Sequence, residues 1–551
     1  MRLLTVLATC LLTAACAVDG AVRHRAAAEI TPEAFNSYVT TLASDEFEGR
    51  KPASHGEQVT IEYLEKEFLA LGLQPANGGS FRQGVPMVEI TATSDASLSV
   101  AAADGTRLPL RVGDDVVMWT KRVQPTVSLA PSELVFVGYG INAPEYGWND
   151  YAGVDMRGKT AVVLINDPGY VTGDPTLFNG KALTYHGRWT YKYEEAARQG
   201  AAAVMIIHDT APAAYGWATV RNSWMGPQLD LDSPDGNAGR VAIESWISGE
   251  AAGRMFQMAG LDLAALKASA AQRGFRAVPM GLKAEGGVRN IIRRSKSNNV
   301  AGVMPGSEKP DEYVVYLAHW DHLGRSLSLA GGDSIFNGAV DNATGVAGIL
   351  SIARAYRSMM PRSKRSVLFL AVTGEESGLL GSAHYAEHPI VPLEKTAAVI
   401  NLDGMAPLGR ARDVVVIGAG ASELEDYLAD AARAQDRVVR PDPVPENGYF
   451  YRSDHFNFAK KGVPALYIDS GTDIRGRPAG WAKTQLDDYT AKRYHQVGDN
   501  YDPAWDISGI MEDLVLAFEV GARVASEDRW PNWRQGNEFR AARDASESAR
   551  R

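Results

Sequence analysis

Residues 313–324 read YVVYLAHWDHLG, a short apolar run followed by two histidines and an aspartate. Four runs of the same kind come later in the chain: VLFLAV (367–372), TAAVINL (396–402), VVVI (414–417) and VPALYI (463–468). Short, continuous, β-branched runs are typical of strands buried on both faces of a mainly parallel sheet. Residues 346–356 and 507–525 have apolar residues at helical spacing. The sequence therefore predicts an α/β fold with a mainly parallel mixed sheet flanked by helices.

The polar residues that follow these runs are the candidates for chemistry, because an open α/β sheet carries its functional site at the carboxyl ends of its strands. They are His319, Asp321, His322, Asp341, Glu375, Glu376 and Asp403, with His495 just before the last helix. Each alone is a weak signal, since a histidine after a strand is more often a packed or surface residue and a Glu-Glu pair is usually solvated. Together, so many carboxylates at one sheet edge are unfavourable unless cations neutralise them. The set therefore indicates a metal site.

The cysteine content narrows the choice of metal ligands. The chain has two cysteines, Cys10 and Cys16. Cys10 lies inside an N-terminal signal, so the mature chain holds at most one cysteine and forms no internal disulfide. A Cys-rich zinc site is excluded too, and His, Asp and Glu must hold any metal. Nitrogen and oxygen donors suit zinc, with manganese or cobalt as substitutes in other conditions.

The first residues predict export. An apolar segment, residues 3–12, leads into small residues before a cysteine, Thr13-Ala14-Ala15-Cys16. This pattern is typical of a secretory signal over residues 1–16 and resembles a bacterial lipobox, in which Cys16 becomes the lipidated first residue. Thr13 stands where a lipobox most often has Leu, so cleavage after Ala17 is the alternative. We expect a periplasmic protein or one lipid-anchored to a bacterial membrane, and no later run is long enough to span one.

Length and charge bound the class of protein. A chain of 551 residues with 45% apolar and 22% charged residues is expected to fold into two or three domains. A net charge of -10 leaves no basic face for phosphates, which argues against nucleic acid as the main partner. Residues 526–551 mix Arg with Glu and Asp and are predicted to be a polar, solvated C-terminal tail.

Changes in amino-acid composition along the chain predict its domain boundaries. Residues 29–96 are assigned to the first part of the main domain, and within them residues 31–73 are predicted to be helical, with Gly72 as the stop. Residues 97–278 contain short β-rich runs with many Gly and Pro, and are predicted to form a separate inserted α/β unit. Residues 279–525 carry the strand and helix alternation of the main domain.

Six separated motifs stand out along the main domain. They are HWDHLG (319–324), GDSIFNGAVDNATGVAGIL (332–350), TGEESGLLGS (373–382), NLDGM (401–405), SDHFNFAKKGVPALYID (453–469) and YHQVGDN (494–500). In order and content they closely resemble the zinc aminopeptidase family related to glutamate carboxypeptidase, glutaminyl cyclase and the transferrin receptor. A further segment, LASDEFEGRKPASHGEQ (42–58), matches the N-terminal region of that family.

The resemblance implies two co-catalytic zinc ions per chain. His319 and Asp403 would hold one zinc, Glu376 and His495 would hold the other, and Asp341 would bridge both. All five positions carry the residue types that the family requires.

The same resemblance gives roles to two more residues. Asp321 would accept the second N–H of the His319 imidazole and fix its tautomer. Glu375, adjacent to a ligand but assigned no metal, would be the general base that takes a proton from the attacking water. The bond between Asp341 and Asn342 would be a cis peptide.

The expected activity is removal of the N-terminal residue from peptides outside the cytoplasm. Tyr449, Phe450 and Tyr451 are candidates for the wall of a pocket that binds an apolar first residue. Ser453-Asp454-His455 does not indicate a serine triad, because adjacent residues on one segment rarely converge on each other. The segment is expected to form part of the pocket wall and to support the metal ligands.

Three other functions occur within the same family. A carboxypeptidase or dipeptidase would use the same metals and grip a substrate carboxylate, for which Arg325 or Arg452 could serve, and this alternative stays open. A cyclotransferase would use one zinc, which the intact Asp341 disfavours. A receptor-like binding protein would be expected to have lost ligands, and none is lost.

The inserted unit resembles a protease-associated domain. The resemblance rests chiefly on ELVFVGYGI (133–141), GYGINAPEYGWNDYAGVDMRGKTAVVL (138–164) and YEEAARQGAAAVMII (193–207). The unit carries no predicted catalytic residue. It is expected to act either as a lid that shapes access for peptides or as a spacer that adds stability.

Overall fold

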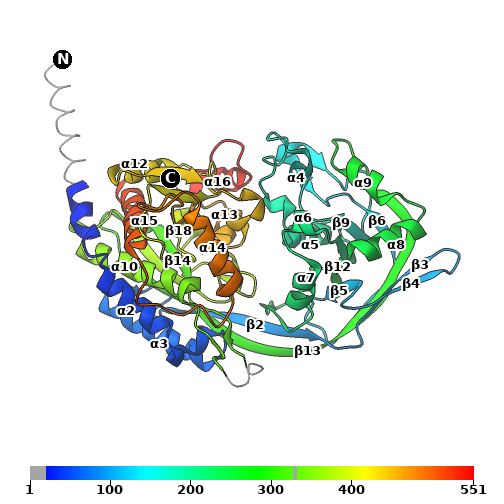
Figure 1. Cartoon of the computed structure of the whole chain (residues 1–551), viewed down its shortest axis with the longest axis horizontal. Coiled ribbons are helices and arrows are strands. Elements are labelled where there is room, and N and C mark those ends of the chain that lie inside the picture. The colour runs from blue at the N-terminus through cyan, green and yellow to red at the C-terminus, as the bar shows by residue number, and fades with distance from the viewer. Residues whose placement is uncertain (1–19, 327–331, 551) are drawn as a thin grey trace, which may run out of the picture. The chain divides into compact units, whose positions relative to one another are not determined.

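The computed structural model describes residues 20–326 and 332–550 (Figure 1). The predicted signal at residues 1–16, with its candidate lipidation site Cys16, lies outside the described residues. The chain divides into two compact units. The first unit comprises residues 1–85, 296–442 and 452–551, and the second comprises residues 86–295 and 443–451.

The second unit contains the predicted insertion and is longer at both ends. Its boundaries, at Pro86 and Ser295, lie inside strands β2 (Arg82–Ala92) and β13 (Val278–Met304). The composition of the sequence changes near residues 97 and 278 and therefore predicts boundaries there. The structure places the boundaries inside β2 and β13 instead. Residues 443–451 also cluster with this unit, although they are remote from it in sequence.

The first unit is built on one mixed sheet whose hydrogen-bonded order is β1–β13–β17–β14–β18–β21–β19–β20. The strands other than β13 are β1 (Gln74–Pro75), β14 (Lys309–His319), β17 (Arg365–Val372), β18 (Thr396–Asn401), β19 (Asp413–Ile417), β20 (Val438–Pro441) and β21 (Ala465–Asp469). β14 is parallel to β17 and β18, and β18 is parallel to β21. Every residue of β17 and β18 is buried, as the continuous apolar runs predicted. The predicted fold class is confirmed.

Helices flank this sheet (Figure 1). They are α10 (Thr344–Ser358), α11 (Leu380–Glu387), α12 (Leu424–Ala434), α13 (His455–Lys460), α14 (Trp481–Lys492) and α15 (Ser508–Ser526). Ile349 of α10 and Leu514 and Phe518 of α15 share one buried cluster with Tyr316 of β14. Burying each such side chain contributes about 1.5–3 kcal/mol, so these two helices help to fix the central strands that carry the polar residues.

The N-terminal segment forms two helices, α2 (Pro32–Leu42) and α3 (His55–Ala70), separated by the 3-10 turn η1 (Asp45–Arg50). The prediction of helix over residues 31–73 is correct at both ends and wrong in the middle. Glu48 and Gly49 adopt positive φ angles of 46° and 66°, which interrupt helical geometry. A Cβ on Gly49 would lie 2.4 Å from the carbonyl oxygen of Gly324. The turn is therefore set by packing against a remote loop, which apolar spacing does not reveal.

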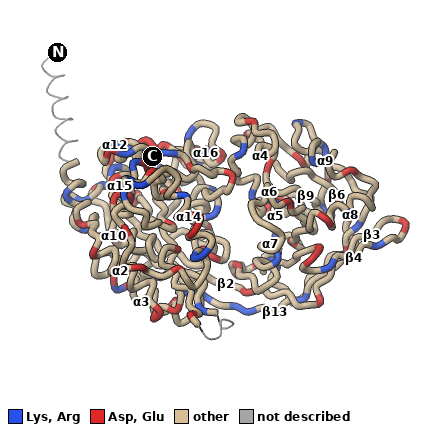
Figure 2. The backbone as a smooth tube through the Cα atoms, in the orientation of Figure 1, with Lys and Arg blue, Asp and Glu red and all other residues tan. Residues whose placement is uncertain are grey.

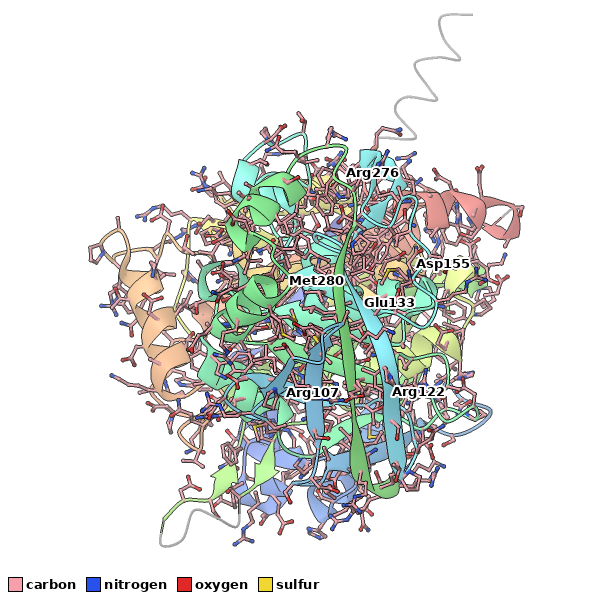
Figure 3. All side chains as sticks on the ribbon, turned by 90° about the vertical axis from the view of Figure 1, so that its right-hand side faces the viewer. Arg107, Arg122, Glu133, Asp155, Arg276 and Met280 are labelled. Atoms are coloured by element: carbon pink, nitrogen blue, oxygen red, sulfur yellow. The ribbon has the colours of Figure 1, made fainter. Side chains whose placement is uncertain are left out.

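The second unit holds its own sheet. β9 (Thr160–Leu164), β10 (Ala203–Ile207) and β12 (Ile243–Ile247) are parallel, and β5 (Val116–Trp119) is antiparallel to β12. β6 (Thr126–Phe136) pairs with β9 and with β13, and β13 also pairs with β3 (Ser97–Ala102), which forms a hairpin with β4 (Arg107–Leu110). Figure 3 shows these adjacent strands, with Met280 on β13 and Glu133 on β6. Helices α5 (Trp189–Arg198) and α8 (Gly249–Met258) complete this α/β unit.

The predicted solvated tail is wrong for much of residues 526–551. Trp533 is fully buried and donates from Nε1 to the carbonyl oxygen of Gly462 at 3.0 Å. Arg543 is 1% exposed and donates to the carbonyl oxygen of Thr396 at 3.0 Å. The charge pattern of this segment is common in tails, but Trp533, Phe539 and Arg543 are buried within the first unit.

Acidic and basic residues are interspersed along the backbone of both units (Figure 2). Within residues 20–326 and 332–550, the helices are all too short or too polar to cross a membrane.

Candidate active site

The carboxyl edge of the first unit's sheet brings the predicted site residues together. His319 is the last residue of β14, Glu375 and Glu376 follow β17, and Asp403 follows β18. Asp341 lies in the loop that opens α10, and His495 lies in the turn after α14. Residues as remote in sequence as His319 and His495 therefore meet at one edge. The sequence order of the strands made this convergence predictable.

Two histidines converge on one carboxylate. His319 Nε2 lies 3.3 Å from Asp341 Oδ1, and His495 Nε2 lies 3.2 Å from Asp341 Oδ2. His319 Nε2 is also 3.1 Å from Asp403 Oδ1, and His495 Nε2 is 2.9 Å from Glu376 Oε2. The two oxygens of Asp341 thus face different histidines, as a bridging carboxylate requires.

The electrostatics of the cluster fit divalent cations. Burial disfavours charge on His319, but the carboxylates led by Asp403 raise its pKa well above the ordinary value. Burial likewise disfavours charge on His495, while the Asp341 and Glu376 carboxylates beside its Nε2 raise its pKa to about 10. The carboxylates therefore favour positive charge at two adjacent positions, one beside His319 and one beside His495. His, Asp and Glu donors at both places are a donor set that zinc accepts.

The loop that carries Asp341 is fixed by side chains on several elements. The Asp341–Asn342 bond is a cis peptide, as the resemblance implied. Asn342 donates from Nδ2 to the carbonyl oxygen of Leu402 and accepts the N–H of Gly404, both at 3.1 Å. Asp499 accepts the N–H of Asp341 at 3.1 Å. These bonds tie the bridging residue to the loop that carries Asp403.

Asp321 accepts the second N–H of His319, as the resemblance implied, and it does so through its backbone carbonyl. His319 Nδ1 donates to the backbone carbonyl oxygen of Asp321 at 3.1 Å, whereas the nearer carboxylate oxygen lies 3.8 Å away. That carboxylate oxygen accepts the backbone N–H of Glu375 at 3.2 Å. The turn after β14 points the carbonyl at the imidazole and the side chain at the next loop. Asp321 still fixes the His319 tautomer, and it also positions Glu375.

Glu375 differs from its neighbour Glu376. Within the described part of the chain, Glu375 makes no ion pair with a histidine, whereas Glu376 pairs with both His322 and His495. Burial, together with the charges of Glu376 and Asp403, raises the pKa of Glu375 well above its ordinary value, although His319 opposes this. A carboxyl that is near the site, not paired with a histidine and easily protonated suits a general acid or base.

The sequence gives His322 no specific role, and it places Ser453 only in a segment expected to line the pocket and support the ligands. His322 Nδ1 lies 2.5 Å from Glu376 Oε1, and Ser453 Oγ donates to Asp403 Oδ2 at 2.5 Å. His322 belongs to the same motif as His319, and Ser453 opens the SDH motif, so both motifs were visible. Their contacts were not, because both cross between separate loops.

Arg50, from the N-terminal segment, binds two of the loops that carry candidate ligands, those of His319 and Asp341. It is 1% exposed, and its guanidinium donates to the carbonyl oxygens of Trp320 at 2.9 Å, Asn337 at 2.6 Å and Gly338 at 2.8 Å. It also donates to the carbonyl oxygen of Leu42 at 2.6 Å. The segment LASDEFEGR thus supports the site through the hydrogen bonds of one buried guanidinium group.

Replacing Arg50 by Lys is expected to lower the melting temperature and the zinc affinity together. One ammonium group cannot reproduce a planar fork that spans four carbonyls. Losing even one hydrogen bond from a charged group costs about 1.5–3 kcal/mol of unfolding free energy. Thermal unfolding and zinc titration measure both effects. Arg412→Lys, at an exposed arginine paired with Asp473, is the matched control. A variant at Arg50 that keeps both values would contradict this role.

The predicted substrate residues form a separate group. Tyr449, Phe450 and Tyr451 make up the 3-10 turn η7 (Tyr449–Tyr451), which clusters with the second unit. Phe450 is buried and Tyr449 is 37% exposed. Their place in a substrate pocket stays a prediction, as does the use of Arg325 or Arg452.

Comparison with known proteins finds similarity to peptidases. Residues 299–519 match peptidase family M28. The aminopeptidase NAALADL1 of Mus musculus is 34% identical over 130 residues, which are 23% of this chain and only 16% of that protein. The aminopeptidase YwaD of Bacillus subtilis is 24% identical over 459 residues, covering 81% of this chain and 87% of that protein. An aminopeptidase from Aneurinibacillus sp. strain AM-1 aligns in structure with a TM-score of 0.49 and 20% identity, covering 92% of this chain and 96% of that chain.

Proposed function

We propose, from the premise that residues 299–519 form a peptidase family M28 domain, that this protein is a zinc-dependent aminopeptidase. The observation that carries the proposal is the position of Asp341, whose two oxygens face His319 and His495. Two zinc ions per chain would be held by His319, Asp403, Glu376 and His495, with Asp341 shared between them. The relatives named above as aminopeptidases support removal of an N-terminal residue from peptides.

The residues of the chain divide the chemistry between them. Zinc bound at such a site supplies a Lewis acid for the scissile carbonyl and lowers the pKa of a bound water. The Glu375 carboxylate accepts a proton from the attacking water and returns it to the leaving amine nitrogen. Asp321 holds the Glu375 backbone in place through the N–H bond described above. Its backbone carbonyl keeps the proton of His319 on Nδ1 and leaves Nε2 to face the carboxylates.

We also propose where the protein is located and what its second unit does. The N-terminal signal supports a periplasmic protein, or one lipid-anchored through Cys16, and fractionation of cells carrying Cys16→Ala distinguishes the two. The resemblance of the second unit to a protease-associated domain supports a role in peptide access. Substitutions confined to that unit should then change KM with peptide length more than kcat for a small aminoacyl amide.

A substrate panel tests the activity. Aminoacyl p-nitroanilides and unblocked peptides should be cleaved, while N-acetylated peptides should not, because an aminopeptidase needs the free amine. A zinc chelator should abolish cleavage, and added zinc should restore it. Cleavage of N-blocked dipeptides with a free carboxylate would instead show a carboxypeptidase of the same family, and no chelator effect would overturn the metal chemistry.

A further inference from the structure

One carboxylate oxygen of Glu376 faces the predicted zinc ligand His495, and the other contacts His322. Its Oε2 lies 2.9 Å from His495 Nε2, and its Oε1 lies 2.5 Å from His322 Nδ1. His322 is 1% exposed, and a Cβ on Gly338 would lie 2.5 Å from the His322 ring. The ring therefore packs closely against the Gly338 backbone while its Nδ1 contacts the carboxylate.

The proton in this contact belongs to the histidine. An ionised carboxylate only accepts hydrogen bonds, so His322 Nδ1 must donate to Glu376 Oε1. Within the residues that the structure describes, the other ring nitrogen, Nε2, is buried and has no hydrogen-bond partner. The His322 side chain thus directs its hydrogen bonding at Glu376.

Asp403 repeats this arrangement with a hydroxyl donor. Its Oδ1 lies 3.1 Å from His319 Nε2, and its Oδ2 accepts the Ser453 hydroxyl at 2.5 Å. Asn401, the last residue of β18, donates from Nδ2 to Ser453 Oγ at 2.7 Å. Since the hydroxyl has a single proton and its oxygen already accepts from Asn401, that proton is directed at Asp403.

We propose that His322 and Ser453 are positioning residues that confine Glu376 and Asp403 to zinc coordination through one oxygen each. This rests on the two-zinc function proposed above. Each zinc would then be held by a histidine nitrogen, one oxygen of its own carboxylate and one oxygen of Asp341. Three protein donors leave a coordination position open for water and for the peptide, which distinguishes a catalytic zinc from a structural one.

The alternative is that one of these residues is itself a ligand. His322, Asp341 and Glu376 each offer a ligand atom, and these atoms lie within 4.8 Å of one another. A sixth protein ligand of this kind would fill the open position of one zinc. The two possibilities differ in what the His322 side chain must supply: a hydrogen-bond donor at the Nδ1 position, or a lone pair for the metal.

An asparagine side chain separates these two possibilities, so the test compares His322→Asn with His322→Ala. The amide nitrogen of asparagine can occupy the place of Nδ1 and donate to Glu376, but it is a poor zinc ligand. Ser453→Ala removes the donor to Asp403. Ser351→Ala is the matched control, because the Ser351 hydroxyl is buried and donates to the carbonyl oxygen of Ala347 in α10.

The measurements use the full chain without substrate. Zinc stoichiometry and affinity come from competition with a chromophoric chelator, and Co²⁺ replaces zinc to report coordination number through its visible absorption. Thermal unfolding shows that each variant is folded. We expect His322→Ala and Ser453→Ala each to lose about 10- to 100-fold in affinity at one of two sites. Their Co²⁺ absorption should also weaken, because the freed oxygen adds to the coordination shell. His322→Asn and Ser351→Ala should stay within a few-fold of the parent protein.

Other results overturn the inference. Equal losses in His322→Asn and His322→Ala would make His322 a ligand. Unchanged affinity and Co²⁺ spectra in His322→Ala and Ser453→Ala would leave neither residue a role at the metals. Failure of the proposed function is seen separately, because the unmodified protein would then bind fewer than two zinc ions or cleave none of the aminoacyl substrates.

Discussion

Glu375→Gln is expected to lower kcat for an aminoacyl p-nitroanilide by about 10²- to 10⁴-fold while both zinc ions stay bound. Glutamine keeps the shape of the side chain but cannot take a proton from water. Glu375 makes no ion pair with a histidine in the described part of the chain, so the change removes no predicted ligand. Its position depends on the bond from its backbone N–H to Asp321, which the substitution leaves intact. KM should change little, because the missing interaction belongs to the transition state.

The neighbouring residue provides the control for this experiment. Glu376→Gln should lose zinc as well as activity, because the Glu376 carboxylate contacts both His322 and His495. Metal analysis and steady-state kinetics on the two variants separate a base from a ligand. If Glu375→Gln loses zinc and Glu376→Gln keeps it, the two roles have been exchanged.

Asp341→Asn is expected to reduce bound zinc from two equivalents to one or none and to abolish measurable turnover. An amide offers one oxygen and one nitrogen that carries protons, so it cannot present two anionic oxygens to two metals. The contacts of 3.3 Å to His319 and 3.2 Å to His495 depend on both oxygens. Losing the shared charge also leaves two histidines beside each other with less negative charge to hold cations.

Metal analysis after dialysis, with activity measured on the same samples, checks this result. Asp333→Asn is the matched control, because Asp333 is an exposed carboxylate in the same loop region. It should keep two equivalents of zinc and full activity. Two tightly bound zinc ions in Asp341→Asn would show that the carboxylate does not bridge them.

The sequence by itself determined the sheet and the set of residues at its edge. The runs YVVYLA, VLFLAV and TAAVINL are mainly apolar because their strands are buried on both faces. Such a pattern can be recognised from neighbouring residues in the sequence. Each candidate ligand follows such a run or opens the next helix, so its place at the carboxyl edge follows from the topology of a parallel sheet. His319, Asp341, Glu376 and Asp403 could therefore be named without coordinates.

Tertiary structure decided which atoms of these residues meet. In the turn after β14, the His319 imidazole contacts the backbone carbonyl of Asp321 and not its carboxylate. Residue type does not determine which of these two groups points at the imidazole. Arg50 reaches its carbonyl partners, and Ser453 reaches Asp403, only because loops remote in sequence pack together. Trp533 is buried for the same reason, although its segment resembles a solvated tail. Hydrophobic pattern specifies the strands locally, whereas hydrogen-bond partners at the site depend on side-chain directions that only the packed chain fixes.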